Sequence, residues 1–112
     1  MRAADADIYV PAIVFGELRR GVERVRHRGD VAQASALDQW LVQLETVYAG
    51  RVIPVDVRVA DTWGRLQVPD RVPVIDALLA ATAIVHGLTL VTRNVRDVAG
   101  TGVRCLHPFE PP

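Results

Sequence analysis

Apolar residues in this chain recur in two patterns that predict different elements. Short unbroken apolar runs are typical of buried parallel strands, and apolar positions three or four residues apart are typical of helices. The predicted order is strand, helix, helix, strand, helix, helix, strand, strand. Strands separated by helices imply parallel pairing, so we predict an α/β fold with a thin, mostly parallel sheet. The predicted strands are 8–10, 51–55, 88–91 and 103–106. The predicted helices are 12–26, 31–48, one that follows an N-cap at Asp56 and carries Val59 to Leu66, and 76–86.

The most apolar helix is predicted at 76–86, where only three residues are polar and the first of them is Asp76. A helix that is apolar nearly all round is a buried helix. Gly87 suits the C-terminal cap of this helix. The strand at 88–91 follows and leads into a polar loop at 92–97. Because sites in open α/β sheets form beyond the carboxyl ends of strands, Asp76 and this loop are the first functional candidates.

Three acidic residues fall at element ends or on inward helix faces, and they belong to three separate elements: Glu17, Asp76 and Asp97. Glu17 lies between Ile13 and Gly21 on the predicted apolar arc of its helix, where a carboxylate needs a partner or a function. Carboxylates from separate elements are the ligands that Mg²⁺ prefers. Such an ion can activate water and stabilise charge on a phosphodiester. The three acids are therefore a candidate metal site.

The spacing leaves structural alternatives open for each of these residues. Glu17 could pair with an arginine one turn along its helix. Asp76 could be the N-cap of its helix, and Asp97 could be a solvated loop residue. Asn94, which is the only asparagine, could serve a turn.

The composition narrows the function classes. A chain of 112 residues predicts one domain, and its zero net charge implies no general affinity for nucleic acid. The single cysteine, Cys105, excludes an internal disulfide and a cysteine-based zinc site. No apolar run approaches the ~18 residues of a membrane span, so we expect a cytoplasmic protein. All 13 basic residues are arginine, and their crowding at 19–28 suits either phosphate contact or a solvated helix face. The crowded arginines are Arg19, Arg20, Arg24, Arg26 and Arg28.

Several segments resemble the PIN-domain ribonucleases, specifically the VapC-like toxins of type II toxin–antitoxin pairs. The segments are YVPAIVFGELRRGVE (9–23), RVIPVD (51–56), PVIDALLAATAIVHGLTLVTRN (73–94) and VRCLHPFE (103–110). The resemblance implies a PIN-like three-layer sandwich in which helices flank a thin parallel sheet. It also implies RNA cleavage that depends on Mg²⁺ or Mn²⁺, a cognate antitoxin as partner, and a homodimer.

The resemblance assigns roles to individual residues. Glu17 and Asp76 match the metal-binding glutamate and aspartate of the family. Asn94 stands where some members have aspartate, and Asp97 is a second acid close by, so all four are catalytic candidates. The residues expected to contact or orient RNA are Thr92, Arg93, Arg96 and Arg20.

The chain departs from the family at its beginning. Relatives start with a strand that ends in a metal-binding aspartate, and no segment of this sequence matches it. The expectation is therefore a single PIN-like domain over 1–112 that lacks the first central strand, binds metal weakly and cleaves RNA poorly. The alternative is an inactive remnant that acts only through antitoxin binding or dimerisation.

Overall fold

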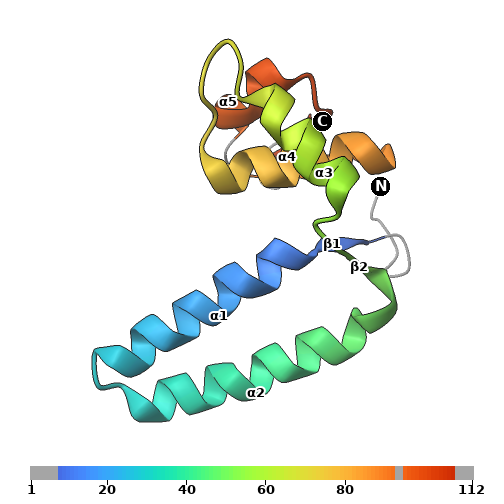
Figure 1. Cartoon of the computed structure of the whole chain (residues 1–112). Helices are drawn as coiled ribbons and strands as arrows, with labels where there is room; N and C mark the ends of the chain where they lie inside the picture. Colours follow the sequence, from blue (N-terminus) through green and yellow to red (C-terminus); the bar gives the residue numbers. More distant parts are fainter. Residues whose placement is uncertain (1–7, 93–94, 108–112) are drawn as a thin grey trace. The chain divides into compact units, whose positions relative to one another are not determined.

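The computed structural model describes residues 8–92 and 95–107, and it confirms the predicted α/β class (Figure 1). The chain divides into two compact units, Met1–Pro54 and Val55–Pro112. The prediction of a single domain over 1–112 stays a prediction. The first unit contains β1 (Val10–Pro11), α1 (Ala12–His27), α2 (Val31–Val47), η2 (Ala49–Arg51) and β2 (Val52–Ile53). The second contains α3 (Val57–Leu66), α4 (Val74–His86), β3 (Leu90–Val91), α5 (Val95–Val98), η3 (Ala99–Thr101) and β4 (Cys105–Leu106).

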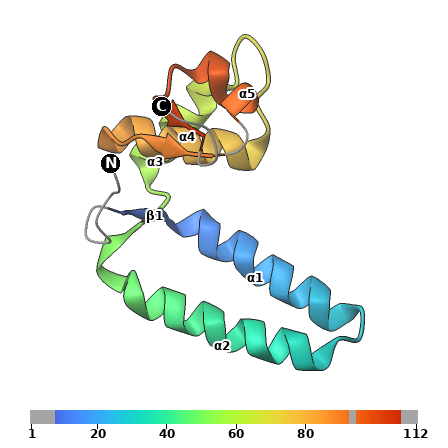
Figure 2. The same cartoon turned by 180° about the vertical axis from the view of Figure 1, so that it is seen from behind.

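The first unit is a helical hairpin with one pair of strands at its open end. Helices α1 and α2 run side by side in opposite directions (Figures 1 and 2). Gly29 at φ 95° makes the turn between them, and Asp30 caps α2 by accepting a hydrogen bond from the Gln33 amide at 3.1 Å. Strands β1 and β2 are parallel, with Val10 opposite Val52. The predicted parallel pairing across a helical crossover is therefore confirmed for this pair.

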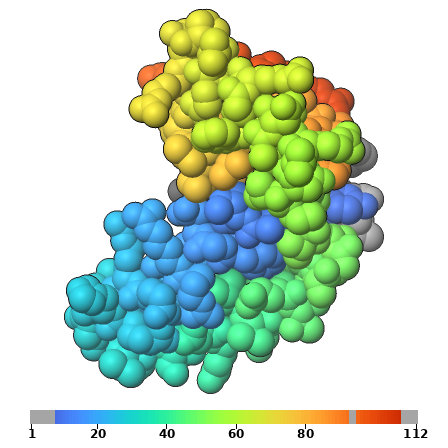
Figure 3. All heavy atoms as spheres, viewed as in Figure 1, coloured from blue at the N-terminus to red at the C-terminus, as the bar shows by residue number. Residues whose placement is uncertain are grey.

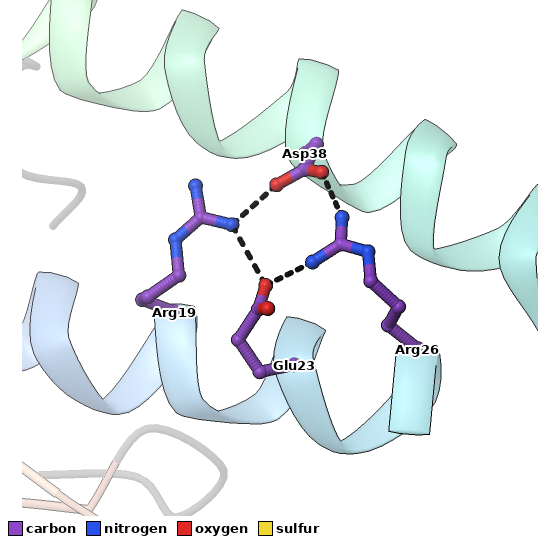
Figure 4. A network of polar contacts seen from close by, with 4 residues as sticks. All are labelled: Arg19, Glu23, Arg26 and Asp38. Carbon is purple, nitrogen blue, oxygen red and sulfur yellow. Dashed lines mark hydrogen bonds and ion pairs between the residues drawn. The ribbon is translucent and has the colours of Figure 1, made fainter. Parts of the chain in front are cut away.

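The contact between α1 and α2 is partly apolar and partly charged. Side chains of the two helices meet along the hairpin (Figure 3), and Val22, Ala34 and Leu41 are buried in it. Gly21 is exposed, so the apolar arc predicted for α1 is wrong on that side. Beside its buried residue Val22, α1 presents two arginines to α2. Arg19 and Arg26 both bind Asp38 of α2 (Figure 4).

The second unit is built around α4, which is the buried helix that the sequence predicts. Five of its residues are buried, and α3 packs along it. Alanine dominates this buried set, which lets neighbouring elements approach the helix closely; the set is Ala77, Ala80, Ala81, Thr82 and Ala83. The hydroxyl of Thr82 donates to the Leu78 carbonyl at 2.7 Å, so the one polar member is satisfied within the helix.

Strands β3 and β4 form the second parallel pair, with Leu90 opposite Cys105. Gly87 ends α4 in the left-handed conformation at φ 65°, which confirms its predicted role as a cap. Leu90 packs with Val98 of α5 and with Ala80 and Ala83 of α4 in one buried cluster. Each of the four described strands has only two residues, so the strands are shorter than the sequence predicts, and they form two separate two-stranded parallel sheets. No helix in the described part of the chain is both long and apolar enough to span a membrane.

Candidate active site

Asp76 lies in the first turn of α4 and is partly buried. The helix begins after Pro73, which occupies the N-cap position without any side-chain cap, so the alternative that Asp76 is the N-cap is wrong. Within residues 8–92 and 95–107, its carboxylate has neither a hydrogen bond nor an ion pair. The positive end of the helix dipole favours a negative charge in this turn. Asp76 is thus a partly buried carboxylate whose oxygens are available to a ligand.

Glu17 lies in the middle of α1, in the first unit. Its side chain is 39 % exposed, and one carboxylate oxygen is 3.7 Å from Nη1 of Arg20. This is the ion pair that the sequence left open as an alternative. The distance is at the long end for an ion pair, and exposed pairs of this kind contribute little to stability. The contact with Arg20 therefore leaves Glu17 free to bind another cation.

Asp97 lies on the exposed side of α5, a helical turn inside the segment predicted as a polar loop. The same turn buries Val98 in the core of the second unit, which holds the turn in place. Arg96 is exposed beside Asp97. Thr92 continues β3, and its backbone amide donates to the Leu106 carbonyl at 3.1 Å. The other two candidates of this loop, Arg93 and Asn94, lie outside the described residues.

The candidate acids divide between the two units: Glu17 belongs to the first, and Asp76 and Asp97 belong to the second. The described residues contain no group of three His, Cys, Asp or Glu side chains arranged to hold a metal. Mg²⁺, however, commonly uses only one or two protein carboxylates and takes waters and substrate phosphate for the rest of its shell. The free carboxylate of Asp76 fits that kind of binding.

The structure distinguishes two kinds of arginine on α1. Arg19 and Arg26 both bind Asp38 of α2, and both also contact Glu23 (Figure 4). The hydrogen bond from Arg19 is the largest cause that lowers the pKa of Asp38, and the bond from Arg26 is the largest that lowers the pKa of Glu23. Asp38 is not among the candidates that the sequence pattern indicates, although it is the only acid in the first three turns of α2.

The remaining arginines of this segment have a different environment. Arg20, Arg24 and Arg28 are exposed and recur every four residues. Among the described residues, Arg20 has only the long contact with Glu17, and Arg24 and Arg28 have no ion pair. The crowding of arginines in the sequence therefore combines a structural network with a set that is open to an anion.

A family model described as PIN domain matches residues 1–99 of this chain. Among curated relatives, Toxin FitB of Neisseria gonorrhoeae is 28 % identical over 109 residues, which cover 92 % of this chain and 76 % of that protein. VapC ribonuclease Y4jK of Sinorhizobium fredii is 28 % identical over 111 residues, covering 93 % and 76 %. Ribonuclease VapC1 of Rickettsia felis is 32 % identical over 94 residues, covering 80 % and 66 %.

Solved structures show the same fold. The crystal structure of FitAcB from Neisseria gonorrhoeae superposes with a TM-score of 0.88 at 27 % identity, covering 97 % of this chain and 81 % of that one. The structure of FitAB bound to a DNA fragment also gives a TM-score of 0.88, at 24 % identity, covering 98 % and 79 %.

Proposed function

This chain belongs to the PIN-domain family, and we propose that it is the endoribonuclease toxin of a toxin–antitoxin pair, which cleaves RNA phosphodiester bonds with the help of a divalent metal. Its relatives support the proposal, since two of them are named VapC ribonucleases and another is named a toxin. The net charge and the composition of the chain neither favour nor oppose a ribonuclease. Support for this function comes from the family and from the environment of a few residues.

The observation that carries the metal site is the environment of Asp76. Asp76 is partly buried and has no hydrogen bond or ion pair among the described residues, so its carboxylate oxygens are open to a cation. We assign Asp76 as the principal ligand of Mg²⁺ or Mn²⁺, Glu17 as the second, and Asp97 with Asn94 as further catalytic groups. When bound, the metal would activate the attacking water and neutralise charge on the phosphodiester.

The arginines proposed to hold RNA lie beside two of the proposed catalytic acids. Arg96 is exposed next to Asp97 on α5, and Arg20 is exposed next to Glu17 on α1. A guanidinium beside each proposed catalytic acid can bind the phosphates that flank the scissile bond. Thr92 and Arg93 complete the proposed RNA contacts.

The proposed protein partners are a cognate antitoxin and a second copy of the chain. The FitAB and FitAcB structures and the relative named Toxin FitB support an antitoxin. The cytoplasm, where RNA and an antitoxin would both be encountered, is the proposed location.

The test compares two aspartate-to-asparagine changes in the same unit. Asp76→Asn removes the proposed ligand, and we expect RNA cleavage in Mg²⁺ to fall on the order of 10²-fold or more, the scale of losing one electrostatic stabiliser from an active site. Asp56→Asn is the matched control. Asp56 caps α3 by accepting from the Val59 amide at 2.9 Å, and asparagine caps as well as aspartate. This control should keep both the fold and the activity.

Two outcomes would contradict the proposal. One is that Asp76→Asn and Asp56→Asn cleave RNA equally well. The other is that the wild-type chain co-purifies with a small antitoxin yet shows no metal-dependent cleavage, which would favour the alternative of an inactive PIN protein that acts only by binding.

A further inference from the structure

The arginines of α1 divide by helix face. Arg19 and Arg26 turn toward α2 and bind Asp38, together with Glu23 (Figure 4). At about 100° per residue, Glu17 lies on the opposite face of the helix from this network. That opposite face also carries the arginines that the network leaves out, which are Arg20, Arg24 and Arg28.

These three arginines form a regular row. They are spaced by four residues, so each lies about 6 Å further along the helix axis than the one before. Arg28 follows the end of α1, but its amide still donates to the Arg24 carbonyl at 3.2 Å, so the helical path continues through it. The Arg20 side chain is 63 % exposed, and Arg24 and Arg28 are also exposed. The row therefore presents evenly spaced guanidinium groups to solvent, with Glu17 at one end.

Stabilisation of the helix alone explains little of this row. Cations near a helix C-terminus do complement the dipole, and Arg24 is in the last turn. Arg26 already supplies positive charge there, however, and Arg20 lies in the middle of the helix. Nor does the row reflect a generally basic protein, because the net charge of the chain is zero.

We propose that Arg20, Arg24 and Arg28 are a phosphate-binding track that holds single-stranded RNA along α1, beginning at Glu17. This inference rests on the proposed ribonuclease function, since it takes the RNA substrate as the ligand. Guanidinium groups bind phosphate with two parallel hydrogen bonds, and a row of them positions a strand without reading its sequence. The even spacing favours RNA over an acidic peptide, because RNA carries one phosphate at every nucleotide.

Salt dependence of binding measures such contacts directly. For single strands, the slope of log K against log salt changes by about 0.7 for each phosphate contact. We would measure anisotropy of fluorescent oligo(U) with EDTA present, so that no cleavage occurs. The double variant Arg24→Gln/Arg28→Gln should reduce the magnitude of the slope by about 1.4, which corresponds to two lost contacts.

Matched variants show whether a change in slope comes from these particular arginines, from the lower net charge, or from misfolding. Arg58→Gln/Arg65→Gln removes the same charge from exposed positions on α3, and it should leave the slope unchanged. The charge-preserving change Arg24→Lys/Arg28→Lys should retain most of the wild-type slope. A slope that is unaltered in the Arg24/Arg28 glutamine variant, or that falls equally in the α3 variant, would overturn the track.

Two further measurements distinguish RNA from an acidic protein as the ligand, and failure of the track from failure of the ribonuclease function. If polyglutamate binds through Arg24 and Arg28 while oligo(U) does not, the row serves an acidic protein and the proposal is wrong. Failure of the ribonuclease function has a different signature, which is absence of wild-type cleavage while the slope difference for oligo(U) persists. Failure of the track alone leaves cleavage sensitive to Asp76→Asn and the slope insensitive to the arginines.

Discussion

Asp56 and Asp76 lie at the starts of neighbouring helices, yet their surroundings differ. Asp56 is the N-cap of α3 and bonds to the Val59 amide, as its position before the helix predicts. Asp76 lies three residues after the N-cap Pro73, inside the first turn of α4, and makes no such bond. The sequence leaves a capping role open for both aspartates, because each stands where a helix is predicted to begin. The difference depends on where α4 begins, which is set by Pro73.

These environments predict different changes in the free energy of unfolding when each carboxylate is removed. Asp56→Ala loses the cap and should lower the free energy of unfolding by about 1 kcal/mol. Asp76→Ala removes a carboxylate with no described partner, and we expect a change within about 0.5 kcal/mol. Urea unfolding of both variants checks this. A larger loss for Asp76→Ala than for Asp56→Ala would mean that Asp76 has a structural role.

The helical hairpin of α1 and α2 shows what sequence patterns predict and what they do not. Apolar spacing predicts both helices, and Asp30 with Gln33 three residues later has the spacing of an N-terminal cap, which the structure contains. The network around Asp38 joins it to Arg19 and Arg26, which are 19 and 12 residues away. Those contacts depend on how the two helices are aligned, and no local pattern specifies that alignment.

This network predicts a loss of hairpin stability in acid. Bonds from the arginines hold the pKa values of Asp38 and Glu23 below their ordinary ones. The stabilisation is therefore fully present above the unfolded pKa values, about 4, and is lost as the pH falls through the lower folded values. The stability difference between wild type and Asp38→Asn should be largest near pH 7 and shrink below about pH 4. Urea unfolding midpoints of the two proteins, measured at pH 7 and below about pH 4, give this difference. An equal difference at the two pH values would contradict a stabilising role for the network.

Over the whole chain, the α/β class, the helices and the parallel pairing follow from the sequence. Both strand pairs join strands that are neighbours in the chain, β1 with β2 and β3 with β4. The turn of α5 was not predicted, because four residues are too few for a periodic signal and its order comes from burying Val98. The resemblance to the family is the basis for proposing which acids bind metal, whereas the structure shows that Asp76 has no hydrogen bond or ion pair among the described residues.

The most direct test of the central claim is binding of Mn²⁺, followed by the electron paramagnetic resonance signal of the free ion. We expect the wild-type chain and Asp56→Asn to deplete the free-ion signal equally, and Asp76→Asn to deplete it far less because the principal ligand is gone. Equal depletion by wild type and Asp76→Asn would contradict the assignment of Asp76 as the metal ligand, and with it the proposed active site.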